Sequence, residues 1–340
     1  MQIGVIGGGS WGSALAILFA SKFDVLIYSR DYDQVDTLNR LHINPKSLPE
    51  SIKFNSKIIA SNNFVDLAKA DLLLIATPIS ALREILQKIK QTFTNIALPD
   101  LIWVCKGFEV ESGLLAHQMV DEVLENPRNV GALLGPSFAL EVATNLPTAI
   151  TLASHNSEFI NKWINHFVGL DNFRIYGNLD LTGCEVATGM KNVIAIASGI
   201  SDGLKLGYNA RAALITRSLS ELGLLVKALG GRVETIYGLT GVGDLILTCT
   251  GELSRNRKVG LALANGEKLE EILANMGHVA EGVYATKALH NIGTKLNLDM
   301  PITNAVYQIL YEGVDLSKAI NQLFLRSPKH EFQHPAGPDF

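Results

Sequence analysis

Short, uninterrupted apolar runs alternate with amphipathic helical patterns over the first half of the chain. The runs have strand length and lie at Gln2–Ile6, Asp24–Tyr28, Asp71–Ala76, Leu101–Cys105 and Val130–Leu134. Apolar strands separated by helices are typical of a parallel sheet that is covered on both faces. The pattern therefore predicts an α/β region built on a mostly parallel sheet.

The segments between these runs have the spacing of apolar residues expected of helices. Helices are predicted over Gly12–Ser21, Pro78–Thr92 and Gly113–Asn126, and two more strands over Pro147–Ala153 and Asn172–Tyr176. These two strands are expected to close the sheet at one edge.

After about residue 180 the apolar positions recur with a period of 3.6, which predicts an all-α second domain. We expect a dinucleotide-binding domain over 1–179, a helical substrate domain over 180–326 and a flexible tail over 327–340, which contains three prolines. The apolar stripes are Val186, Met190, Val193, Ile194 and Ala197; Leu269, Ile272, Leu273 and Met276; and Leu316, Ala319, Ile320 and Leu323.

Composition narrows the class of protein. Of 340 residues, 47% are hydrophobic and 18% charged, which excludes disorder for most of the chain. The formal net charge of −4 argues against a nucleic-acid partner or an anionic membrane surface. No apolar run approaches the roughly 18 residues of a spanning helix, so no stable membrane insertion is expected.

Three widely spaced cysteines, Cys105, Cys184 and Cys249, suit a reducing compartment and have no metal-ligand spacing. We interpret each as a small buried hydrophobe and expect no metal. The N-terminal residues lack a basic segment and a cleavage site, so we expect a cytoplasmic protein.

A glycine-rich turn joins the first predicted strand to the first helix. Gly7, Gly9 and Gly12 fit the G-x-G-x-x-G pattern. The first glycine allows a tight turn, the second lets the backbone approach a pyrophosphate, and the third lets the helix pack closely. A plain turn is the alternative, but the strand–turn–helix context favours dinucleotide binding and a Rossmann-like fold.

The end of the second strand bears on which dinucleotide binds. Ser29 stands near the position where NAD-specific sites carry an acidic residue, and Arg30 is placed to meet a 2′-phosphate. This slightly favours NADP over NAD. The alternative is that Arg30 is a solvated charge at the strand end, with Asp31 and Asp33 following it.

Ligands of open parallel sheets bind at the carboxyl ends of the strands, where Lys106 and Gly135 follow apolar runs. Lys191 lies in a segment that is apolar nearly all round. It shares a helix face with Thr188 and Ser198, and we expect the three to face a cleft together. A buried lysine is costly, so we expect it to line a cleft or have a partner. Burial and a second lysine would lower its pKa toward the range of proton transfer. An ordinary surface lysine is the alternative at each position.

Two segments of the helical half carry further candidate chemistry. A glycine-flanked turn presents Asp244. Ser254 stands in an N-cap position before Arg255 and Arg257, and basic residues in a first helical turn disfavour the helix dipole unless an anion binds there. This indicates a phosphate site, with a solvated helix start as the alternative.

Seven stretches together resemble one family, the bacterial-type glycerol-3-phosphate dehydrogenases. They run in family order over most of the chain. They are GGGSWG at 7–12, CKGFE at 105–109, GPSFALE at 135–141, GMKNVIAIASG at 189–199, TGVGDLILTCT at 240–250, SRNRKVG at 254–260 and VAEGVYATKA at 279–288.

The resemblance implies a homodimer that reduces dihydroxyacetone phosphate reversibly to sn-glycerol 3-phosphate with NAD(P)H, supplying the glycerophospholipid backbone. It implies that Lys191 transfers the proton. Implied substrate contacts are Lys106, Gly135, Ser137, Asp244, Ser254, Arg255 and Asn256. Implied cofactor contacts are Ser10, Trp11, Arg30, Lys106, Ala139, Arg255, Val279 and Glu281, beside the turn glycines.

Two other functions remain open from the residues themselves. A β-hydroxyacid dehydrogenase or a ketopantoate-type reductase also combines such a sheet with helices and a lysine. A non-enzymatic nicotinamide-binding redox sensor would not need Lys106, Lys191 and Asp244 together.

Overall fold

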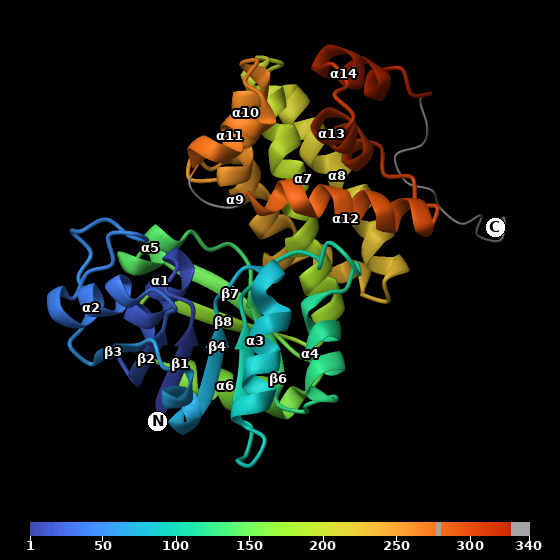
Figure 1. Ribbon diagram of the computed structural model, residues 1–340. Coiled ribbons are helices and arrows are strands. Elements are labelled where there is room, and N and C mark those ends of the chain that lie inside the picture. Colours follow the sequence, from blue (N-terminus) through green and yellow to red (C-terminus); the bar gives the residue numbers. More distant parts are fainter. Residues whose placement is uncertain (277–279, 328–340) are drawn as a thin grey trace.

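A computed structural model describes residues 1–276 and 280–327 of the chain. The N-terminal half forms a sheet covered by helices, and the C-terminal half is a group of helices that lies above it in Figure 1. The expected class, an α/β Rossmann-like region followed by an all-α region, is confirmed. The predicted tail beyond Ser327 lies outside the described residues.

Eight strands form one sheet in the order β3-β2-β1-β4-β5-β6-β7-β8. The order reverses between β1 and β4, and at such a reversal the carboxyl ends of parallel strands leave a crevice for a ligand. The strands are β1 Gln2–Ile6, β2 Asp24–Tyr28, β3 Ile58–Ser61, β4 Leu72–Ile75, β5 Asp100–Trp103, β6 Val130–Leu134, β7 Thr148–Ala153 and β8 Phe173–Asn178.

The sheet is parallel except between β6 and β7, which pair antiparallel. The two predicted closing strands are β7 and β8. The sequence analysis did not predict the edge strand β3, whose burial alternates along only four residues.

Fourteen α-helices lie in the described residues. Their bounds are α1 Ser10–Phe19, α2 Tyr32–Leu41, α3 Ile79–Thr92, α4 Ala116–Leu124, α5 Ala139–Ala143, α6 Ser157–Phe167, α7 Leu181–Gly203, α8 Tyr208–Ala228, α9 Asp244–Thr250, α10 Arg255–Ala264, α11 Leu269–Met276, α12 Glu281–Lys295, α13 Pro301–Tyr311 and α14 Leu316–Phe324. Short 3-10 turns lie at Phe64–Lys69 and Val233–Tyr237, and a π-helical turn at Leu239–Gly243 precedes α9.

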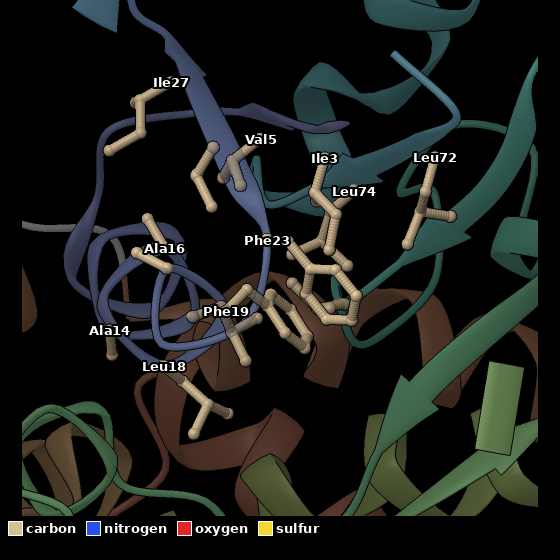
Figure 2. Packing of buried hydrophobic residues seen from close by; sticks show 14 of the residues in the cluster. Ile3, Val5, Ala14, Ala16, Leu18, Phe19, Phe23, Ile27, Leu72 and Leu74 are labelled. Atoms are coloured by element: carbon tan, nitrogen blue, oxygen red, sulfur yellow. The ribbon is translucent and has the colours of Figure 1, made fainter. Parts of the chain in front are cut away.

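Alternate strand residues point to opposite faces of the sheet, so each face has its own apolar core. On one face α1, α2, α5 and α6 cover the sheet, and on the other α3 and α4 do. Figure 2 shows part of the first core, which joins Ala16 and Phe19 of α1 with the strand residues Ile3, Val5 and Leu74 in one apolar cluster. These cores hold the carboxyl ends of the central strands in fixed places.

The helical region is organised around α7, which is buried along nearly its whole length, as its apolar sequence predicts. It contacts α8, α9, α10, α12 and α13. It crosses α10 closely, because a Cβ atom added at Gly199 would lie 2.1 Å from the Arg257 carbonyl oxygen. Within the described residues, no helix has the length and apolar character that a membrane crossing requires.

Candidate active site

The candidate site lies where the carboxyl ends of β1, β4, β5 and β6 meet α7 and α9. The glycine turn has the geometry that the sequence predicts. Gly7 has a φ of +118°, which favours glycine, and a Cβ at Gly12 would lie 2.1 Å from the Gly7 carbonyl oxygen. A Cβ at Gly9 would meet nothing within 4 Å, so the space above Gly9 is open to a ligand.

The N-terminus of α1 is suited to an anion. Gly9 is its N-cap, no side chain caps its N–H groups, and its first turn has no acidic residue. Free N–H groups and the positive end of the helix dipole attract a phosphate. Ser10 and Trp11 in this first turn are partly exposed, and the Ser10 hydroxyl donates to the Ser47 carbonyl at 2.7 Å.

A buried polar network holds this turn from behind, and the sequence analysis did not predict it. The Gly8 carbonyl accepts hydrogen bonds from Gln34 Nε2 at 2.9 Å, Asn44 Nδ2 at 2.8 Å and Ser47 Oγ at 2.8 Å. Several donors on one carbonyl fix the orientation of that peptide plane. The turn is therefore pre-formed before any cofactor binds.

At the end of β2, the Asp31 carboxylate is already bound by neighbouring groups of the protein, whereas the Arg30 guanidinium is exposed. Ser29 is buried and donates to Gln34, whereas Arg30 is exposed. Asp31 accepts from the Gln34 backbone N–H and pairs with Lys46, which lowers the pKa of its carboxyl. Asp31 thus serves as the N-cap of α2. Within the part of the chain described, Arg30 forms no ion pair.

Lys106, Asp244 and Lys191 form one group of three charged side chains in the site, with Asp244 between the two lysines. Lys191 Nζ lies 2.6 Å from Asp244 Oδ1 and 2.9 Å from Thr248 Oγ1. Lys106 Nζ lies 2.8 Å from Asp244 Oδ2 and 3.0 Å from the Gly135 carbonyl oxygen. Lys106 after β5, Lys191 in α7 and Asp244 in α9, each predicted from the sequence as a site residue, therefore meet at one point.

The three charged side chains of this group are largely shielded from solvent, Asp244 most of all. The Asp244 side chain is fully buried, and those of Lys191 and Lys106 are 9% and 13% exposed. Burial, together with the nearby Lys106 charge, lowers the pKa of Lys191 to about 8, against the opposing effect of Asp244. A lysine with such a pKa is able to give up a proton near neutral pH.

Two buried polar atoms beside the site are unsatisfied within the described residues: Asn192 Nδ2 and Thr77 Oγ1. Asn192 follows Lys191 in α7, and Thr77 follows β4, next to Gly7. Buried polar atoms are seldom left without a partner. With the open space at Gly9 and the free α1 N-terminus, they fit a bound dinucleotide and substrate.

The start of α10 is only partly as predicted. Ser254 is its N-cap and accepts from the Arg257 backbone N–H at 3.2 Å. Arg257 does not face an anion site, because its guanidinium pairs with Asp202 at 2.7 and 2.9 Å. Arg255 is exposed, and Asn256 is buried and accepts from the Gly282 N–H at 2.9 Å.

The remaining predicted contacts surround the lysines. Ser137 Oγ donates to the Gly135 carbonyl at 3.1 Å, and Ala139 begins α5, which packs on α1. Burial raises the pKa of Glu281 at the start of α12, while the charges of Arg255 and both lysines act to lower it. Val279 lies outside the described residues.

The prediction that Thr188 and Ser198 face the cleft with Lys191 is wrong. Both side chains are fully buried. The Thr188 hydroxyl donates to the Cys184 carbonyl, and the Ser198 hydroxyl to the Cys249 carbonyl at 2.8 Å. They satisfy backbone groups within the packed helices.

Two residues of the site were missed. Thr248 holds Lys191 and donates to the Asp244 carbonyl at 2.6 Å, four residues back on the same helix. The spacing of four between Asp244 and Thr248 was the available signal, because such residues share a helix face. Asn192 directly follows Lys191 and was hidden by the apolar character of its neighbours.

The three cysteines are buried and unpaired, as expected. No group of three or more potential metal-ligating side chains comes together in residues 1–276 and 280–327.

The model of the NAD-dependent glycerol-3-phosphate dehydrogenase N-terminus matches residues 2–160, and that of the C-terminus matches residues 180–321. The chain belongs to this family. It is 44% identical over 335 residues to the glycerol-3-phosphate dehydrogenase [NAD(P)+] of Aromatoleum aromaticum, covering 97% of this chain and 100% of that protein. It is 46% identical to that of a Janthinobacterium species, with 97% and 99% covered.

Solved structures agree with this assignment. The glycerol-3-phosphate dehydrogenase of Coxiella burnetii superposes with a TM-score of 0.89 at 41% identity, covering 96% of this chain and 99% of that one. A ketopantoate reductase of Ralstonia eutropha reaches a TM-score of 0.58 at 14% identity. The latter likeness shows a related fold alone, so the family assignment stands over that alternative.

Proposed function

We propose that this member of the family reduces dihydroxyacetone phosphate reversibly to sn-glycerol 3-phosphate with NAD(P)H. The observation that carries the proposal is the pair of lysines on the buried Asp244, opposite an open glycine turn. A redox sensor needs the turn but not a buried ammonium with a lowered pKa.

We assign the cofactor to the turn formed by Gly7, Gly9 and Gly12 and the first residues of α1. The bound dinucleotide supplies the hydride. Uncapped N–H groups of α1 hold its pyrophosphate, Arg30 favours a 2′-phosphate, and Lys106, Ala139 and Glu281 border it. NADP is thereby slightly favoured over NAD.

Lys191 acts on the substrate carbonyl. Negative charge develops on the carbonyl oxygen during reduction, and an ammonium group there stabilises that charge and donates the proton. Thr248 and Asp244 orient Lys191. Lys106, fixed by the Gly135 carbonyl and Asp244, holds the substrate and polarises the same oxygen.

The substrate phosphate binds at the start of α10, with Ser137 and Gly135 on the opposite side. Arg255 is the exposed cation there, while Ser254 and Asn256 shape the backbone around it. A charged anchor away from the reacting carbon supplies binding energy that positions the carbonyl.

We further propose that residues 1–179 form the cofactor domain and 180–326 the substrate domain. We also propose a homodimer, for which the apolar side chains exposed on the helical region give support, among them Tyr208, Phe324 and Leu325. Sedimentation analysis tests the dimer. The buried free cysteines favour a cytoplasmic protein, and the product suits glycerophospholipid synthesis.

A spectrophotometric assay at 340 nm tests the activity, with NADPH and NADH each offered with dihydroxyacetone phosphate, ketopantoate and a β-keto acid. Of the three substrates, only dihydroxyacetone phosphate is expected to support oxidation of NADPH. Turnover of ketopantoate in preference to the phosphate ester, or no turnover of any substrate, would contradict the proposal.

A further inference from the structure

A second buried carboxylate, in α7, lies apart from the group formed by Lys106, Asp244 and Lys191. Glu185 is 4% exposed and stands six residues before Lys191. It accepts from the Trp103 indole N–H at 2.7 Å and from the His117 backbone N–H at 3.1 Å, and it also contacts His117 Nδ1. None of these atoms belongs to the site proposed for substrate or cofactor.

These donors come from two different elements. Trp103 is the last residue of β5, three residues before Lys106. His117 is in the first turn of α4. Burial acts to lower the pKa of His117, but its pairing with Glu185 and the nearby Asp121 together raise it by more. One carboxylate therefore fastens the strand that leads to Lys106, and the start of α4, to the helix that carries Lys191.

The two lysines meet at Asp244, so the junction of β5 with α7 is held at two places. Helix geometry puts Glu185 about 9 Å along α7 from Lys191. Trp103 stands three residues before Lys106, and three residues of chain span at most about 10 Å. Besides these two polar fastenings, Gly107 and Phe108, which follow Lys106, pack on Gly189 of α7. Glu185 holds the inner end of this junction.

We infer that Glu185 is a positioning residue for the reaction, which sets the placement of Lys106 relative to Lys191 by fastening β5 and α4 to α7. This inference rests on the proposed function, in which both ammonium groups act on one carbonyl oxygen. A misplacement of about 1 Å in a residue remote from the chemistry is able to cost about 10²-fold in rate.

The chain contains a matched control in Asp100, at the other end of β5. Asp100 is 6% exposed and accepts from the Trp163 indole N–H at 2.7 Å and from Lys162 Nζ at 2.7 Å. It fastens β5 to α6, on the opposite end of the strand from Lys106. Its loss removes a buried carboxylate–indole bond of the same kind without touching α7.

The experiment compares Glu185→Ala, Glu185→Gln and Trp103→Phe with Asp100→Ala at a temperature at which each variant is folded by circular dichroism. Glu185→Ala should lower kcat by about 10²-fold with a smaller change in KM, and Trp103→Phe by about tenfold. Glu185→Gln keeps an acceptor for the indole and should recover most of the loss. Asp100→Ala should lower Tm and leave kcat near the wild-type value.

A second readout does not depend on turnover. NMR titration of ¹³C-labelled lysine side chains reports the pKa of Lys191, which the nearby Lys106 helps to lower to about 8. If Glu185→Ala or Trp103→Phe lets the ammonium groups separate, that pKa should rise by about half a unit or more. Asp100→Ala should leave it unchanged.

The outcomes separate the two proposals. Wild-type protein without activity on dihydroxyacetone phosphate would refute the proposed function, and the titration would still judge the positioning role. Normal kcat and an unshifted Lys191 titration in folded Glu185→Ala and Trp103→Phe would overturn the inference, as would an equal loss of kcat in Asp100→Ala. If Glu185→Ala does not fold, Trp103→Phe decides by the same two readouts.

Discussion

Replacing Lys191 by alanine is the most direct perturbation of the proposed chemistry. The side chain is 9% exposed and donates to Asp244 and Thr248, so its loss takes one cation out of a buried group of three charges. Asp244 keeps Lys106 at 2.8 Å. Because Lys106 and Asp244 still form an ion pair with no net charge, we expect the variant to fold.

The magnitude follows from the role of the ammonium group. Positioned general acids contribute about 10²- to 10⁴-fold to rate, which is about 3 to 5 kcal/mol of transition-state stabilisation. Lys191→Ala should therefore lower kcat by at least about 10²-fold. Cofactor affinity should change little, because the glycine turn lies on β1 and α1. Lys191→Arg should not restore activity, since a guanidinium does not release a proton near neutral pH.

The assay is steady-state reduction of dihydroxyacetone phosphate between pH 6 and 10, with NADPH binding followed by fluorescence. Because Lys191 must be protonated to donate and its pKa is about 8, wild-type kcat should fall above pH 8. Lys106→Ala should instead show a large rise in KM. A folded Lys191→Ala enzyme with near-normal kcat would refute the reasoning and make Lys106 the leading proton donor.

Three further predictions concern other parts of the molecule. Gly9→Val should weaken NADPH binding while unfolding stays cooperative, because the side chain fills the open space above the turn; unchanged affinity in a fluorescence titration would contradict it. Arg255→Ala should raise KM for dihydroxyacetone phosphate and reduce the preference for NADPH over NADH, whereas Arg257→Ala, which loses the pair with Asp202, should mainly lower Tm. Burial raises the pKa of Glu221 to about 7 from 4.5, so the unfolding free energy should fall as pH rises from about 4.5 through 7. Glu221→Gln should flatten that dependence in denaturant titrations, and an unaltered slope would show that other groups cause it.

The parts of the fold that the sequence predicted are those with continuous apolar signals. The strands β1, β2 and β6 have the expected bounds, and α7 is buried as its composition requires. Elements at the rim gave no such signal. The helix α2 buries only Gln34, Val35 and Leu38, and β3 is a four-residue edge strand. The antiparallel direction of β7 was not predictable either, because a short apolar run does not encode strand direction.

For the site, local motifs predicted the residues and long-range pairing decided their partners. Lys191 and Asp244 are 53 residues apart and Lys106 and Asp244 are 138 apart, so their contacts were not visible in the sequence. Likewise Arg257 seemed a phosphate ligand until its pairing with Asp202, 55 residues away, appeared in the structure. A basic side chain in the first turn of a helix predicts a bound anion, but a distant carboxylate of the same protein can pair with that side chain equally well.

The charge of the buried group explains why Asp244 stands between the two lysines. Burial and the nearby Lys106 ammonium both lower the pKa of Lys191, so without a carboxylate that pKa would lie lower still. One carboxylate restores the protonated form and leaves the group with a single net positive charge. That charge suits an oxygen that becomes negative only during the reaction, because it favours the transition state over a neutral carbonyl. The carboxylate is fully buried and bonded to a lysine on each oxygen, so its charge is offset before a phosphate-bearing substrate binds.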